Sequence, residues 1–166
     1  MGKETELDNL GSERWEMELS GKVKSERTAP TDFVDHHETG LTNHRTYSVE
    51  IKNYIDPDHP RRSDKFNNYM IDYDKLLHLE YAKNDTKLLA CYFYDKLVVW
   101  DINKVDWKST KAIRRVNKKG VAYGQETETA VVAYLKIIDA VYTRDIDDEE
   151  RDYWHTRYRE CCRRYS

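Results

Sequence analysis

Residues 44–54 carry the feature that most constrains the fold of this chain, a two-residue alternation of apolar and polar side chains. Tyr47 and Ile51 are among the apolar positions, and Glu50 and Lys52 are among the polar positions that alternate with them. Because successive side chains of a strand point to opposite faces, the alternation predicts a β-strand with one face in a core. A strand of this kind needs partners, so the chain is expected to contain a sheet.

A hairpin is expected around this strand, since residues 30–34 begin an earlier strand and the polar stretch 35–43, with Gly40, connects the two. Helices and further strands on both sides predict an α/β domain with a mixed sheet. In chain order the other expected elements are a helix over 3–20 interrupted at Gly11-Ser12, a short strand over 23–28, a loop over 56–64, a helix over 72–84, and a second hairpin of strands over 88–94 and 97–102, buried on both faces.

Two C-terminal helices are expected within residues 125–166. The first, over 126–142, rests on an apolar stripe at helical spacing made by Val131, Tyr134, Leu135, Ile138 and Val141. The second begins near Asp147-Asp148, where acidic side chains suit the positive end of a helix.

The length of 166 residues predicts one domain over 1–166. The 13 tyrosines and 4 tryptophans argue against disorder, and no apolar run is long enough for a membrane span or an export signal. Three cysteines without metal-ligand spacing favour a reducing, cytoplasmic compartment. The net charge of −3 does not demand a nucleic-acid partner, although a local basic patch is sufficient for one.

Such a patch is expected in the segment 104–124, which we predict to be mobile. This segment contains seven Lys and Arg side chains and a single acidic one, Asp106. We expect Arg114, Arg115, Lys118 and Lys119 to bind nucleic-acid phosphates, together with Arg61 and Arg62 of the loop over 56–64. The alternative is a charged linker that offsets the acidic residues over 145–152.

The chemically informative residues are Asp32, Glu50 and Lys52. The predicted hairpin brings the two carboxylates together, and carboxylate oxygens are ligands for a hard divalent cation. Glu50 and Lys52 share a strand face, about 6.6 Å apart along it. A lysine ammonium there can stabilise an attacking water and the charge that grows on a phosphate. The alternative from the spacing alone is an ordinary solvated strand face.

The motif formed by residues 30–34 and 47–52 resembles the signature of the PD-(D/E)xK nuclease superfamily. The predicted order of elements is also similar to its helix–strand–strand–strand–helix–strand core, here over about 12–107. The chain resembles in particular small uncharacterised nuclease-like proteins of bacteriophages. In these, a tyrosine-rich strand like 90–94 precedes a Val-Val-Trp-Asp strand like 98–101.

The resemblance implies a restriction-endonuclease-like fold and a Mg²⁺- or Mn²⁺-dependent deoxyribonuclease acting in the host cytoplasm. By it, Asp32, Glu50 and the Ile51 carbonyl would hold the metal, and Lys52 would position or activate water. A glutamate from the first helix often joins the site, with Glu13 preferred here over Glu16. The resemblance also leaves a homodimer open. The alternative is a catalytically silent member that binds nucleic acid or a protein partner.

Overall fold

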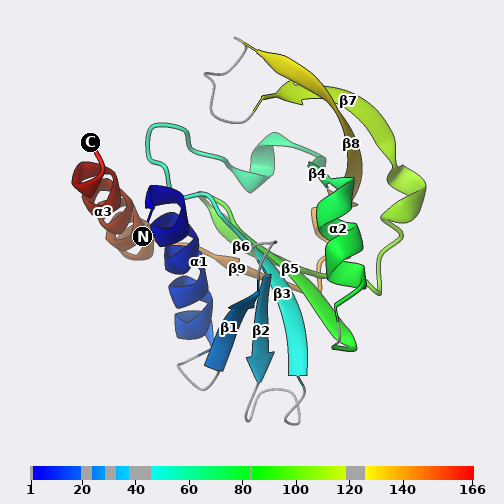
Figure 1. The fold of residues 1–166 in the computed structure, drawn as a ribbon, viewed down its shortest axis with the longest axis horizontal. Helices are drawn as coiled ribbons and strands as arrows, with labels where there is room; N and C mark the ends of the chain where they lie inside the picture. Colours follow the sequence, from blue (N-terminus) through cyan, green and yellow to red (C-terminus); the bar gives the residue numbers. More distant parts are fainter. Residues whose placement is uncertain (1, 20–23, 29–32, 38–45, 83, 119–125) are drawn as a thin grey trace.

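The computed structural model describes residues 2–19, 24–28, 33–37, 46–82, 84–118 and 126–166 (Figure 1). It is a mixed α/β structure with three α-helices and two sheets. The helices are α1 (Lys3–Glu18), α2 (Tyr73–Glu80) and α3 (Asp148–Arg164). The strands are β1 (Lys24–Thr28), β2 (Phe33–His37), β3 (Thr46–Asn53), β4 (Asn68–Asp72), β5 (Thr86–Tyr92), β6 (Lys96–Asp101), β7 (Ala112–Asn117), β8 (Thr127–Lys136) and β9 (Tyr142–Asp145). Short 3-10 helices lie at Ser63–Lys65, Lys108–Thr110 and Ile137–Asp139.

The main sheet has six strands in the order β1-β2-β3-β5-β6-β9. Strands β3 and β5 are parallel and the other neighbours are antiparallel. A parallel pair needs a crossover connection, and α2 lies in the connection between these two strands. The register sets Phe33 of β2 opposite Glu50 and places Leu89 of β5 on the other side of Glu50. The predicted mixed sheet is therefore confirmed.

The second sheet has the order β4-β8-β7. Figure 1 shows β7 and β8 as a long curved hairpin that extends away from the main sheet. At the base of this hairpin, Ala133 and Leu135 of β8 enter the same apolar core as Trp100 of β6. The second sheet is thus joined to the first through a shared core.

The central strands β5 and β6 of the main sheet are buried on both faces, as their apolar runs predict. On one face, Trp15 of α1 packs with Val49 and Ile51. On the other, Leu76 and Leu79 of α2 pack over β5 and β6. Figure 1 shows α1 and α3 side by side and apart from α2. Because side chains of β3 alternate between faces, Glu50 points to the side opposite Ile51, where α2 lies.

The prediction of a helix over 126–142 is wrong, because this segment forms β8, a 3-10 turn and the first residue of β9. Its supposed inward stripe is largely exposed, with 41% of Val131, 87% of Ile138 and 48% of Val141 accessible to solvent. The buried residues of β8 are instead Val132, Ala133 and Leu135, and of these Ala133 and Leu135 share the strand face that enters the core. Of the two expected C-terminal helices, only α3 is present in the part of the chain that the structure describes.

The prediction of a mobile basic segment over 104–124 is also wrong for its described part, which forms a 3-10 turn and β7. Residues 119–124 lie outside the described residues. Strands β4 and β9 were not expected. Strand β2 extends to His37, so the predicted loop over 35–43 begins too early.

Helix α1 is unbroken at Gly11, against the prediction. Gly11 is buried, and a Cβ atom added there would lie 3.3 Å from Cγ2 of Ile51 on β3. The glycine therefore permits close approach of helix and sheet and does not mark a helix end.

Candidate functional site

The candidate site is centred on Glu50, a fully buried carboxylate in the middle of the main sheet. Nζ of Lys52 lies 3.3 Å from Glu50 Oε1. Nζ of Lys75, on α2, lies 3.6 Å from the same oxygen. The two lysine side chains are 24% and 19% exposed, so they connect the buried carboxylate to the surface. The alternative of a solvated strand face is therefore wrong for Glu50.

The local sequence explains why these three groups meet. Residues two apart on a strand share a face, which brings Lys52 to Glu50. Leu76 and Leu79 are fully buried and fix α2 against the sheet, and Lys75 precedes Leu76. Lys75 is not among the residues that the sequence predicts for the site. The signal available was its place in a predicted amphipathic helix that follows the Glu50 strand, but nothing in the pattern showed which strand residue it would contact.

The electrostatics of the trio favour a further negative group. Burying a carboxylate costs several kcal/mol unless it is paired, and two ammonium groups supply that pairing. The charges of Glu50, Lys52 and Lys75 add up to +1. Cys91, the register neighbour of Lys52 on β5, adds no negative charge, because burial raises the pKa of its thiol to about 12. The trio suits a neighbouring carboxylate or a phosphate.

The expected metal ligands are only partly described. Asp32 lies outside the described residues, and Phe33, which follows it, is the register partner of Glu50. The Ile51 side chain points to the face covered by α1. Within the described ranges, no group of three or more His, Cys, Asp or Glu side chains is arranged to hold a metal ion. Of the two carboxylates expected to bind the metal, the described residues include only Glu50.

The structure does not bring Glu13 to Glu50. Glu13 accepts two hydrogen bonds from Arg157 of α3, at 2.8 and 2.9 Å. Helix α1 covers the Ile51 face of β3, opposite the Glu50 face. Glu13 thus links α1 to α3, and the prediction that it enters the site is wrong.

Arg61 and Arg62 occupy the connection between β3 and β4 in different environments. The Arg61 guanidinium lies 4.8 Å from the ring centre of Tyr54 and 5.1 Å from that of Tyr69. Arg62 pairs with Asp64, with Nε 3.0 Å from Oδ1, and is 40% exposed. Arg61 is thus held in an aromatic cluster, while Arg62 is paired with an exposed carboxylate.

The predicted phosphate-binding side chains of β7 lie on the curved hairpin. Arg114 and Arg115 are exposed on neighbouring positions of the strand, and so point to opposite faces. Arg115 donates to Thr127 Oγ1, and Lys118 pairs with Glu126 at 3.8 Å. Lys119 lies outside the described residues. The described basic side chains of the hairpin are accessible to solvent. Because Arg114 and Arg115 point to opposite faces, they do not form one patch.

Comparisons of the chain with protein-family models, with curated proteins and with solved structures find no match. None of the described helices is long and apolar enough to cross a membrane. The function of the chain is therefore inferred from the geometry around Glu50 and from the order of the elements.

Proposed function

We propose that this protein is a metal-dependent nuclease that hydrolyses DNA phosphodiester bonds. The observation that carries the proposal is the buried Glu50 carboxylate with the ammonium groups of Lys52 and Lys75 at one of its oxygens. A buried carboxylate and two partly exposed ammonium groups in the middle of the main sheet provide a ligand for a hard cation and positive charge for a phosphate.

The order of elements supports the proposal. Helix α1, the antiparallel strands β1, β2 and β3, helix α2 and the parallel strand β5 come in the order that the PD-(D/E)xK resemblance predicts, with β4 of the second sheet inserted between β3 and α2. In this arrangement Glu50 and Lys52 lie on the third strand, where the motif requires them. We therefore propose a restriction-endonuclease-like core for the main sheet.

Asp32 and Glu50, with the Ile51 carbonyl, would hold Mg²⁺ or Mn²⁺, which would supply a Lewis acid for the phosphate and lower the pKa of water. Lys52 orients the attacking water and offsets negative charge that grows on the phosphate. Lys75 approaches Glu50 from the helix side and would hold the carboxylate in place while Lys52 interacts with the substrate.

The test is cleavage of plasmid and linear duplex DNA with Mg²⁺ and with EDTA, together with the melting temperature in both conditions. The parental protein should cleave only with the metal and should melt higher in its presence, because a ligand that binds the folded state stabilises it. Glu50→Gln and Asp32→Asn should lose both responses. The control is Glu160→Gln, at an exposed position of α3, which should keep both.

A catalytically silent member of the same fold is the second candidate. It is favoured by the closeness of both lysines to Glu50, since a purely structural buried ion cluster has the same geometry. This candidate predicts DNA binding that is unchanged by Glu50→Gln, no metal-dependent cleavage and no metal-dependent rise in melting temperature.

A further inference from the structure

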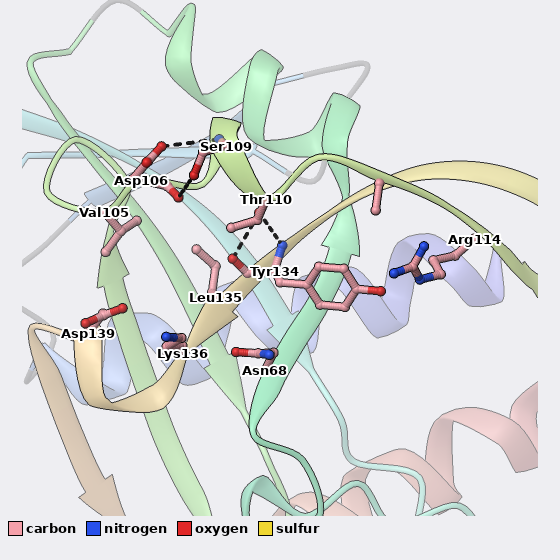
Figure 2. A pocket seen from close by; sticks show the side chains of 11 residues that line it. Asn68, Val105, Asp106, Ser109, Thr110, Arg114, Tyr134, Leu135, Lys136 and Asp139 are labelled. Carbon is pink, nitrogen blue, oxygen red and sulfur yellow. Dashed lines mark hydrogen bonds between the residues drawn. The ribbon is translucent and has the colours of Figure 1, made fainter.

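The outer face of the second sheet carries a pocket of about 490 Å³ that is lined by both polar and apolar residues (Figure 2). Its wall includes Asn68 of β4, Arg114 of β7, and Tyr134 and Lys136 of β8. Residues next to these in sequence, such as Tyr69 and Leu135, enter the core. Because strand side chains alternate between faces, the wall residues point away from the core and from Glu50.

The Tyr134 backbone is fixed at the centre of this pocket. Its N–H donates to Thr110 Oγ1 at 2.8 Å, and the Thr110 hydroxyl donates to the Trp107 carbonyl at 2.7 Å. Trp107 is buried, so the 3-10 turn that carries Thr110 is anchored in the core. Figure 2 shows the Tyr134 ring extending across the pocket, away from this anchor. Tyr134 is thus an aromatic surface on a rigid support.

Charged and polar groups surround the ring. The Arg114 guanidinium carbon lies 5.8 Å from the centre of the Tyr134 ring. Figure 2 shows Arg114 near the hydroxyl end of the ring, with Asn68 and Lys136 at its other side and Asp139 beyond them. Asp106, at the upper rim, accepts a hydrogen bond from the Ser109 N–H at 3.2 Å and is occupied with that turn.

We infer that this pocket binds a nucleotide of single-stranded DNA, with the base stacked on Tyr134 and the flanking phosphates at Arg114 and Lys136. An aromatic side chain on a sheet face with nearby cations is an arrangement that binds unpaired bases. The carboxylate of Asp139 argues against a site for phosphate alone, whereas a carboxylate and the Asn68 amide can both bond to base edges. A paired base is stacked in the duplex and does not offer its face to Tyr134.

This inference extends the proposed partner from duplex DNA to a single strand, and it does not depend on cleavage at Glu50. The protein would hold a single strand on the outer face of the second sheet while the Glu50 site lies on the main sheet. Binding at one site and chemistry at the other are therefore separable by mutation.

The test is fluorescence anisotropy with a labelled 12-nucleotide single strand in EDTA, so that no cleavage occurs. Tyr134→Leu should weaken binding about 5- to 150-fold, the range for one lost stacking contact. Tyr134→Phe should bind like the parent, and Arg114→Gln should flatten the dependence of log affinity on log salt by about 0.7. The matched control is Tyr142→Leu, which changes an exposed strand tyrosine of β9 outside the pocket.

Three results would overturn the inference. They are parental affinity in Tyr134→Leu, equal weakening for a 12-base-pair duplex, and displacement of the oligonucleotide by deoxyadenosine monophosphate at equal nucleotide concentration. The last would indicate a free-nucleotide site. Lys52→Met separates this inference from the proposed nuclease, because it should lower the cleavage rate roughly 10²–10³-fold and leave the single-strand anisotropy unchanged. If only the binding prediction for Tyr134→Leu fails, the cleavage test of the proposed nuclease is unaffected.

Discussion

The Lys52 ammonium lies 3.3 Å from the carboxylate of Glu50, although Glu50 is fully buried. The pair is built into one strand, two residues apart, so its geometry is set by the pleat and not by a flexible loop. Lys75 reaches the same carboxylate oxygen from α2. A buried carboxylate with two ammonium groups beside it is energetically costly to assemble. Charge clusters of this kind are common at functional sites.

Lys52→Met should lower the single-turnover rate of DNA cleavage by roughly 10²–10³-fold, because one preorganised stabilising charge is lost. The aliphatic stem is kept, and Lys75 still compensates Glu50, so the fold should persist. The matched control is Lys96→Met, which removes a similarly exposed lysine paired with Asp145 at 3.6 Å on the same sheet. Cleavage at the parental rate in Lys52→Met would show that the ammonium has no chemical role.

Lys75→Met should lower the free energy of unfolding by about 1–3 kcal/mol, because a buried carboxylate loses one of its partners. Glu50→Gln should also destabilise the metal-free protein, since it leaves two ammonium groups close together. The double variant should be less destabilised than the sum of the two, which urea unfolding of all four proteins measures as a coupling energy. Strict additivity would mean that the contact between Lys75 and Glu50 contributes nothing.

The sequence predicted the parts of the fold that follow from local alternation. The alternation around Val49 and the apolar runs of β5 and β6 each report burial of a strand, and these strands are confirmed. The segment of β8 was wrongly predicted to be a helix, because Val131, Leu135 and Ile138 also fit a helical stripe. Only the pairing of β8 with β4 and β7 decides between the two periods, and that pairing joins residues distant in sequence.

The candidate site was predictable to the same extent. Glu50 and Lys52 share a strand face by their spacing alone, and the structure places them in contact. Two errors came from tertiary packing. Glu13 was expected near Glu50, but the face of β3 that α1 covers is not encoded locally. Lys75 was missed because its contact depends on how α2 crosses the sheet.

Gly11→Leu should destabilise the protein by about 1–3 kcal/mol, because a side chain at this position of α1 collides with β3. A Cβ atom alone would lie 3.3 Å from Ile51 Cγ2 and 3.5 Å from Asn53 Cβ. Gly11→Ala gains helix propensity against this contact and should stay within about 1 kcal/mol of the parent. Glu4→Leu, at an exposed position of the same helix, is the control for thermal unfolding. Equal melting temperatures for both leucine variants would contradict the close packing.

Arg14→Met should lower the free energy of unfolding by about 1–3 kcal/mol. Arg14 is 4% exposed, donates to Glu150 Oε2 at 2.8 Å and lies 4.1 Å from the ring centre of Tyr92. The substitution removes a buried cation that joins α1, α3 and the sheet. Arg157→Met, which breaks the more exposed pair with Glu13, should cost at most about 1 kcal/mol. Chemical denaturation that ranks the two variants in the opposite order would refute this division.

Glu150 should make stability depend on pH in the acidic range. Burial disfavours its ionised form, but hydrogen bonds from Arg144 and Arg14 outweigh this and hold the pKa of the carboxyl below its usual value of 4.5. The unfolded chain therefore binds this proton more readily than the folded protein does. The stabilisation is fully present above about pH 4.5 and is lost as the pH falls through the lower, folded-state pKa.

Urea unfolding of the parent and of Glu150→Gln should give a difference in stability that is constant from pH 7 to 5 and shrinks at lower pH. Glu149→Gln, at an exposed neighbouring position, should show little of this loss. A parent-to-Glu150→Gln difference that is the same at pH 3 and pH 7 would show that the two arginines do not stabilise the ionised carboxylate.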